Sequence, residues 1–368
     1  MRLAVVGCGH LGRIHARLAA ASEAIDLVAV VDPVAEARDA VAADLGVDAL
    51  SDIALLAGRV DAAILAAPTG YHHALGLQLL AAGIHVLIEK PLAISSQESH
   101  KLVEAAGRAE CVLQVGHVER FNPALAAAGS ALSEPKYIEA RRYSGYTFRS
   151  TDVGVVLDLM IHDLDIVLSL VRSPVVAVDA LGVAVMGEHE DTATARIKFA
   201  SGCVANLSAS RVSFERARQM QVWCPESFTA INFDNGTAKV VSPEACLLDG
   251  SFDGDSLSPD QRNEVRDTLF ETLLPIEEKS AAEVNAIAEE HADFLRAIET
   301  GSAPRVTGED GRDAVALAEQ VLAAIAAHEW DGHAGGRIGP HRVQADPIVR
   351  GPHWHMHEDS RANRREAG

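Results

Sequence analysis

The chain has 368 residues, of which 48% are hydrophobic, and it carries a formal net charge of −20. A chain of this length is too long for a single small hydrophobic core, so we expect two domains. The strong negative charge argues against nucleic acid as a partner. A phosphorylated ligand is still compatible with an acidic chain, provided that arginines gather locally around it.

The cysteines indicate a reducing compartment. They are five in number and form no C-x-x-C pair, which argues against a disulfide framework and a structural zinc site. The sequence begins directly with a predicted strand, with no signal peptide before it, and no apolar run approaches the length of a membrane span. We therefore expect a cytoplasmic protein that has no membrane partner.

The first third of the chain alternates short apolar runs with helical patterns. The runs are rich in Val, Ile and Leu, as in strands that are covered on both faces, and they span 3–7, 25–32, 60–68, 85–91 and 111–117. Alternation of this kind predicts a doubly wound parallel sheet. We expect an N-terminal Rossmann domain over residues 1–120, and hence an α/β protein.

After residue 120 the rhythm changes, and strands follow one another without helices between them. The pattern predicts a strand over 137–146, a long helix over 153–172, and hairpins over 192–212 and 228–241 that turn at Ser201-Gly202 and Asn235-Gly236. Residues 242–280 are polar and are expected to be irregular, before helices over 281–301 and 308–329. We expect an α+β domain with a large, mostly antiparallel sheet over 121–330 and a loosely ordered tail over 331–368.

The stretch "VVGCGHLGRIHA" contains the spacing G-x-G-x-x-G at Gly7, Gly9 and Gly12. The glycines follow a predicted strand and open a predicted helix, where backbone amides can approach a pyrophosphate. Asp32 ends the second predicted strand and is placed to accept hydrogen bonds from a ribose. A carboxylate there repels a 2′-phosphate, which favours NAD over NADP. The alternative is an ordinary turn followed by a surface aspartate.

Two further patterns indicate catalysis. In "EKP", Lys90 lies at the carboxyl end of a predicted parallel strand, where ligands of such sheets bind, although a surface lysine alone would look the same. In "LDLMIHDLD", Asp158 and His162 are four residues apart on one predicted helix face, so the carboxylate can orient a histidine base. The alternative is a polar stripe on an amphipathic helix. No third ligand accompanies this pair, and we expect no metal.

Taken together, "GCGHLG", "AAPTGYHH", "GIHVLIEKPLA", "VGHVERFNP" and "DLMIHDLD" resemble the Gfo/Idh/MocA oxidoreductases over residues 1–330. The resemblance implies NAD(P)-dependent oxidation or reduction of a sugar or cyclitol. It also implies an open sheet that binds substrate and joins subunits in a homodimer or homotetramer. It assigns catalysis to Lys90, Asp158 and His162. We expect the cofactor to be bound by Gly7, Gly9, His10, Leu11, Gly12, Asp32, Pro68, Thr69, His72, Glu89 and Lys90.

Residues 115–125 and 148–165 further resemble the branch of the family that oxidises the 3-hydroxyl of UDP-N-acetylglucosamine, at the start of the route to diamino-sugar lipid A. In the mechanism that this implies, His162 takes the hydroxyl proton and Lys90 stabilises the oxyanion. Substrate would be bound by Asp158 and His162, with its diphosphate held by Arg120, Arg142 and Arg149. The alternatives are a family dehydrogenase acting on myo-inositol, a free aldose or a UDP-hexuronate, a reductase that runs in the opposite direction, and a dinucleotide-binding regulator without catalysis.

Overall fold

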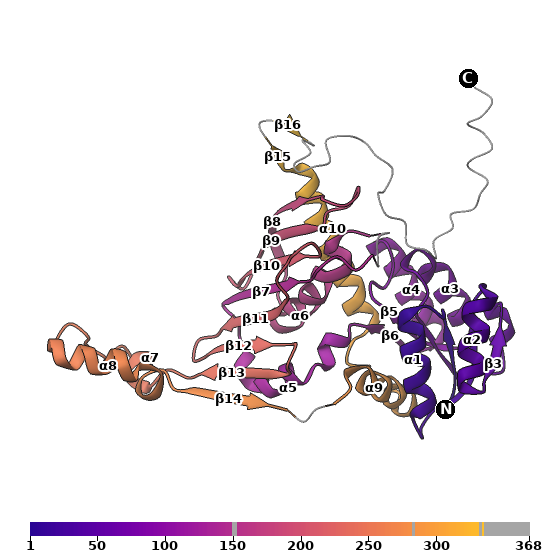
Figure 1. Ribbon diagram of the computed structural model, residues 1–368, viewed down its shortest axis with the longest axis horizontal. Coiled ribbons are helices and arrows are strands. Elements are labelled where there is room, and N and C mark those ends of the chain that lie inside the picture. The colour runs from indigo at the N-terminus through magenta and orange to yellow at the C-terminus, as the bar shows by residue number, and fades with distance from the viewer. Residues whose placement is uncertain (149–152, 282–283, 331–332, 335–368) are drawn as a thin grey trace.

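The computed structural model describes residues 1–148, 153–281, 284–330 and 333–334. Two sheets with their helices lie next to each other, and the chain passes from the first to the second after β6 (Figure 1). Most of the predicted tail and Arg149 lie outside the described residues. Within the predicted tail, a two-residue strand β16 (His333–Ala334) pairs with β15 (Glu329–Trp330).

The first sheet is parallel and doubly wound, as predicted. Its order is β3-β2-β1-β4-β5-β6, formed by β1 (Arg2–Val6), β2 (Asp26–Val31), β3 (Asp48–Leu50), β4 (Ala62–Leu65), β5 (His85–Glu89) and β6 (Leu113–Gly116). The crossovers contain α1 (His10–Ala21), α2 (Ala35–Leu45), η1 (Ile53–Leu56), α3 (Thr69–Ala81) and α4 (Ser96–Ala109). The four residues of β4 and the last four of β5 are all buried, because helices cover both faces of the sheet.

The second sheet has eight strands in the order β14-β13-β12-β11-β7-β10-β9-β8, and only the pair β7–β10 is parallel. Both predicted hairpins are present at the expected turns. The strands are β7 (Tyr137–Tyr143), β8 (Val175–Val183), β9 (Thr192–Phe199), β10 (Val204–Ser210), β11 (Ala217–Trp223), β12 (Phe228–Asn232), β13 (Thr237–Val241) and β14 (Ile276–Ser280).

One face of this sheet packs on a continuous apolar core. That core takes side chains from α5 (Pro123–Ala128), η3 (Gly129–Leu132), η4 (Val156–Met160), α6 (Ile161–Val171) and α10 (Gly308–Ala327). Along β9, residues alternate between buried and exposed, as expected for a sheet with one covered face. The outer face is therefore solvent-exposed in a single chain.

The last two long helices return to the first sheet. Phe294 of α9 (Ala286–Thr300) lies in the core around α1, and Val306 lies in the core on the other face of the sheet. The helix α10 packs against α4, and Thr307 bridges to Gln114 of β6. Thus segments that we expected to belong to the second domain complete the first, and the boundary at residue 120 stays a prediction.

Residues 242–280 are not irregular, contrary to expectation. They contain α7 (Ala245–Leu248), α8 (Pro259–Thr272) and β14, and the two helices form an arm that projects away from the body at the end of the second sheet (Figure 1). The helix α8 buries no residue, so its sequence has no apolar periodicity from which a helix could be predicted. Its capping box, Ser258 with Gln261, and Pro259 at its first position were the available signals. None of the helices in the described part of the chain is both long and apolar enough to cross a membrane.

Candidate active site

The glycine-rich loop joins β1 to α1 by close backbone approach. Gly7 has φ +97°, and a Cβ there would lie 2.7 Å from the backbone of Ala66. A Cβ on Gly12 would lie 1.8 Å from the carbonyl oxygen of Gly7. Gly9 caps α1, whose first residue His10 is exposed and whose second, Leu11, is half-buried. A loop that requires glycine at positions 7 and 12, at a helix N-terminus, fits the pyrophosphate of a dinucleotide.

Asp32 fastens this loop to the end of β2. One carboxylate oxygen accepts the N–H of Cys8 at 2.8 Å, and the other accepts the N–H of Val34 at 2.8 Å. The Arg38 guanidinium donates to the Asp32 carbonyl at 3.0 Å. Asp32 thus holds the loop in its conformation, and its side chain is half-exposed. Its predicted ribose contact stays a prediction.

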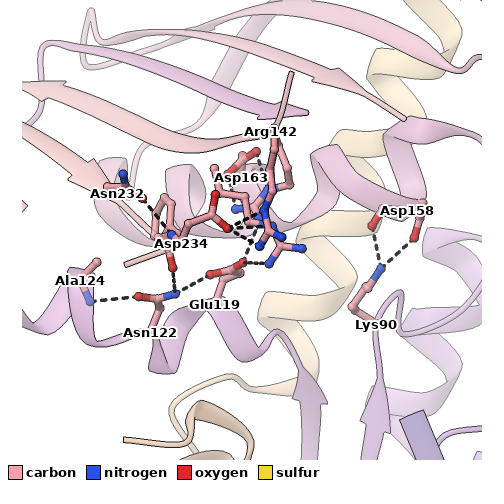
Figure 2. A network of polar contacts seen from close by, with 12 residues as sticks. Lys90, Glu119, Asn122, Ala124, Arg142, Asp158, Asp163, Asn232 and Asp234 are labelled. Carbon is pink, nitrogen blue, oxygen red and sulfur yellow. Dashed lines mark hydrogen bonds and ion pairs between the residues drawn. The ribbon is translucent and has the colours of Figure 1, made fainter. Parts of the chain in front are cut away.

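Lys90 follows β5 and reaches the second domain. Its Nζ donates to the Asp158 carbonyl oxygen at 2.7 Å and lies 3.3 Å from Asp158 Oδ1, as Figure 2 shows. Both side chains are largely buried. Lys90 and Asp158, predicted from motifs 68 residues apart, therefore meet. An ammonium has three N–H donors, so this contact leaves at least one for another acceptor.

Asp158 does not orient His162 in the way we expected. Residues 156–160 form a π-helical turn, η4, before α6 begins at Ile161. Hydrogen bonds from i to i+5 widen such a turn, so residues four apart no longer lie over each other. His162 Nδ1 is buried without a hydrogen-bond partner among the described residues, while Asp158 contacts Lys90. The predicted Asp158–His162 contact is wrong for this reason.

A second histidine, His117, lies beside His162, with the two rings edge to face and their centroids 6.4 Å apart. His117 is fully buried, and neither of its ring nitrogens has a partner among the described residues. Burial lowers the pKa of His117 to about 3, and the positive charges of Lys90 and Arg120 add to this shift. Burial likewise lowers the pKa of His162 well below its usual value, helped by Lys90 and Arg142. Both imidazoles are therefore neutral at pH 7.

Arg142 is held in a buried ion cluster and is not available to a diphosphate. Its guanidinium donates to both oxygens of Asp163 at 3.0 and 2.8 Å and to Glu119 at 2.7 Å (Figure 2). Burial raises the pKa of the Asp163 carboxyl, and the Arg142 guanidinium offsets part of that rise. The donors of Arg142 serve two buried carboxylates, and Arg142 is the ion partner of both, so its contacts do not support the predicted substrate role.

Arg120 is also engaged inside the protein. It donates to Asp165 Oδ1 at 3.2 Å and to the Arg305 carbonyl at 3.3 Å. Burial raises the pKa of Asp165 to about 7, although Arg120 acts against this. The substrate role predicted for Arg120 is therefore not supported by its contacts. Arg149, the third predicted arginine, lies outside the described residues.

The sequence interpretation missed Arg218 on β11, which pairs across the sheet with Arg142 on β7. Its side chain is 44% exposed, and its nitrogens lie 3.9 Å from Glu119 and 3.8 Å from Asp234, beyond hydrogen-bond distance. It also contributes to the lowered pKa of His162, after burial and the charges of Lys90 and Arg142. The sequence did contain a signal for such an arginine. Glu119 and Asp163 are acidic residues in apolar surroundings, and buried carboxylates require cationic partners.

Two predicted cofactor residues lie beneath the site. His72 is buried, with its Nδ1 2.9 Å from the Pro91 carbonyl and its Nε2 2.7 Å from the Ala67 carbonyl. Glu89 is buried against His15 and the Lys90 N–H. Both side chains hold loops together through these contacts, and the cofactor contacts predicted for them stay predictions. Pro68 and Thr69 are half-buried where α3 begins after β4, and their predicted contacts stay predictions.

Comparison with known proteins agrees with this geometry. The sequence profile "Oxidoreductase family, NAD-binding Rossmann fold" of the Gfo/Idh/MocA proteins matches residues 1–117, and the profile of their C-terminal domain matches residues 129–228. The chain belongs to the Gfo/Idh/MocA family of oxidoreductases. The fold class and the resemblance predicted from the sequence are thus confirmed.

Individual relatives in the Gfo/Idh/MocA family cover most of the chain. UDP-N-acetylglucosamine 3-dehydrogenase from Acidithiobacillus ferrooxidans is 36% identical over 89% of this chain and 98% of its own. A solved structure of that enzyme superposes with a TM-score of 0.77 over 88% of this chain and 97% of its own, at 35% identity. The scyllo-inositol 2-dehydrogenase of Bacillus subtilis is 30% identical over 58% of this chain and 68% of its own. A levoglucosan dehydrogenase, at 18% identity and a TM-score of 0.73, shares the fold.

Proposed function

We propose that this protein is an NAD-dependent dehydrogenase that oxidises the 3-hydroxyl of UDP-N-acetylglucosamine to the 3-keto sugar nucleotide. The observation that carries the proposal is the contact of Lys90 with Asp158. The charge of Lys90 also helps to lower the pKa of His162. The chain is similar to a UDP-N-acetylglucosamine 3-dehydrogenase along 98% of that enzyme. The proposed product is a ketone, which suits a later transamination.

The loop around Gly7 and Gly12 fits a dinucleotide, because these glycines allow a tight turn at the N-terminus of α1, where backbone amides can bind a pyrophosphate. NAD⁺ bound at this loop supplies the acceptor for the hydride that leaves the sugar carbon. Asp32 disfavours the 2′-phosphate of NADP by charge repulsion, and its two backbone hydrogen bonds keep its carboxylate in place. We therefore infer NAD as the cofactor.

Lys90 is proposed to stabilise the oxyanion that forms as the hydroxyl proton is removed and that becomes the ketone oxygen when the hydride departs. The two oxygens of Asp158 fix its ammonium, and its remaining donor is directed to the hydroxyl oxygen of the sugar. Because Lys90 is largely buried, this interaction acts at a lower dielectric than in water. Asp158 is thus a positioning residue for Lys90 in this scheme.

His162 is proposed to accept the proton of the hydroxyl. Burial and the cations around it lower its pKa, so the imidazole is neutral and has a lone pair available at pH 7. The lowered pKa also makes it a weak base, so transfer depends on the simultaneous stabilisation of the oxyanion by Lys90. His162 and Lys90 therefore act together in this mechanism.

The substrate's diphosphate requires a cationic side chain that is not already held by buried carboxylates of the protein. We propose Arg218 in place of Arg142 and Arg120, because its guanidinium is half-exposed and its ion pairs with Glu119 and Asp234 are longer than hydrogen bonds. Arg149 stays a second candidate from the sequence. A guanidinium suits this role, since it can donate two parallel hydrogen bonds to phosphate oxygens.

We further propose that the outer face of the second sheet joins two subunits. Tyr137, Trp223 and Phe228 lie in register on this face and are half-buried. The Tyr137 and Trp223 rings are tilted with centroids 4.9 Å apart, and the Trp223 and Phe228 rings stack at 5.4 Å. A hollow of about 410 Å³ lies on the neighbouring strands. Exposed aromatic surface of this kind is typical of protein interfaces. The proposal covers a homodimer or a homotetramer.

The function is tested by NADH formation at 340 nm with NAD⁺ and one of UDP-N-acetylglucosamine, UDP-glucose, UDP-N-acetylglucosaminuronate, glucose and myo-inositol. A transaminase with glutamate removes the keto product, whose formation is uphill. We expect turnover with UDP-N-acetylglucosamine alone. Turnover with inositol or glucose but not with the UDP sugar would overturn the substrate while keeping the dehydrogenase chemistry.

A further inference from the structure

Behind the glycine loop lies a second cluster of titratable side chains, drawn from three elements. His15 comes from α1, Glu89 from the end of β5, and Glu290 and His291 from α9; their exposed fractions are 0%, 7%, 0% and 4%. His15 Nδ1 lies 2.8 Å from His291 Nε2, and His15 Nε2 lies 2.7 Å from Glu89 Oε1. This cluster has no part in the mechanism above.

Glu290 is the anomaly in the cluster. Neither of its carboxylate oxygens has a hydrogen-bond partner among the described residues, although the side chain is fully buried. Its ligand atom, one from His15 and one from Glu89 all lie within 4.8 Å of one another. A buried carboxylate without a partner is strongly destabilising unless a proton or a cation neutralises it. The unpaired oxygens therefore point to a missing positive charge.

We propose that His15, Glu89 and Glu290 bind a divalent metal ion of the Zn²⁺ or Mn²⁺ type. One imidazole nitrogen and two carboxylates are ligands that such ions accept, and a charge of +2 balances the two carboxylates. The contact between His15 Nδ1 and His291 Nε2 supplies the outer hydrogen bond that orients a ligating histidine. Binding displaces the proton between His15 Nε2 and Glu89 Oε1 to solvent.

The ion would tie α1, β5 and α9 together beneath the catalytic lysine. Glu89 is the link, since its second oxygen accepts the backbone N–H of Lys90 at 3.1 Å. The proposed role is structural: the ion fixes α9 on the first sheet and holds the segment that presents Lys90. It goes beyond the proposed dehydrogenase function and does not depend on which sugar is oxidised.

The test uses the full chain without a histidine tag, stripped with a chelator and then dialysed against Mn²⁺ or Zn²⁺. We compare wild type with Glu290→Gln, and with Glu289→Gln as the matched control, because Glu289 is the exposed neighbour on the same helix. Wild type and Glu289→Gln should retain one equivalent more than Glu290→Gln, and their Tm should rise by about 5 °C with the metal. The Tm of Glu290→Gln should not change.

All three proteins contain His353, His355 and His357, so metal bound by those residues cancels in the comparison. Equal metal content and equal Tm shifts in wild type and Glu290→Gln would overturn the proposal and assign a proton to the cluster. If Glu290→Gln does not fold, His15→Gln replaces it in the same comparison. Retention of the extra equivalent by His15→Gln would likewise contradict the site.

Discussion

At the end of β1 the chain builds its half of the site mainly from backbone. A Cβ on Gly7 or Gly12 would collide with neighbouring backbone, and Asp32 is the charged side chain that holds the loop, through the N–H of Cys8. At η4 and β7 the other half is built from side chains, with Lys90 tied to Asp158 and Arg142 tied to Glu119 and Asp163. The comparison teaches that a backbone site depends on local spacing, whereas a side-chain site depends on which distant groups become partners.

Replacing Lys90 by Met should have the largest effect on the side-chain half. We expect kcat to fall by about 10³–10⁴-fold, because the oxyanion loses its only proposed donor, while the Kd for NAD⁺ changes by less than about twofold. Steady-state kinetics and NAD⁺ titration measure the two quantities. Lys101→Met, on an exposed position of α4, is the control and should behave as wild type. Loss of NAD⁺ binding in Lys90→Met would instead mean that the lysine serves cofactor binding, together with the glycine loop.

Arg142→Met tests whether the buried ion cluster is structural. It leaves Glu119 and Asp163 buried without their partner, so we expect the free energy of unfolding in urea to fall by about 3 kcal/mol. Arg141→Met, at the exposed neighbouring position of β7, should change it by less than about 0.5 kcal/mol. A stable Arg142→Met protein with a raised KM for the sugar nucleotide would restore the role predicted from the sequence.

The buried histidines predict loss of stability in acid. The pKa values of His72, His117 and His162 are lowered in the folded state, first of all by burial. Below pH 6.5 the unfolded chain therefore binds protons that the folded chain does not, and stability falls as the pH falls. For His117 this loss continues to about pH 3 and amounts to about 1.4 kcal/mol per pH unit well below pH 6.5.

Urea denaturation at pH 7.5 and pH 5.5 checks this expectation. The fall in stability between the two should be smaller by about 1 kcal/mol in His117→Gln than in wild type. His100→Gln serves as control, since His100 is exposed on α4. An unchanged pH dependence in His117→Gln would mean that His117 is charged or solvated in the folded protein.

An effect of similar size is expected at Asp32, where the backbone half meets a charge. Asp32→Asn removes the repulsion of a 2′-phosphate but keeps one acceptor for the loop, so kcat/KM for NADP⁺ relative to NAD⁺ should rise about tenfold, ~1.4 kcal/mol. Asp39→Asn, which alters only an exposed partner of Arg38, is the control. A wild-type protein that already prefers NADP⁺ would contradict the role given to Asp32.

Most of the fold could be predicted because it rests on short-range patterns. The alternation of buried strands and helices specifies the first sheet, and the turns at Ser201-Gly202 and Asn235-Gly236 specify two hairpins of the second. The helix α8 escaped prediction because it buries nothing and so has no apolar face to detect. Regular structure without a core contact leaves only its capping residues in the sequence.

The site was less predictable where geometry depends on tertiary contacts. The spacing of four residues predicted that His162 and Asp158 share one helix face. The π turn at 156–160 changes that geometry, and no local pattern in the sequence predicts the turn. Arg142 looked free because its partners Glu119 and Asp163 come from other elements of the chain. Such pairings are decided by packing, so a charged residue near a motif is not a reliable indication of ligand binding.

The central claim is that hydride leaves C3 of the sugar of UDP-N-acetylglucosamine, and deuterium at that carbon tests it most directly. With UDP-N-acetylglucosamine deuterated at C3, NAD⁺ and the coupled transaminase, mass spectrometry of the reduced cofactor should find the deuterium there, and Lys90→Met should abolish the transfer. Reduced cofactor without deuterium, or deuterium retained at C3 after turnover, would contradict the account.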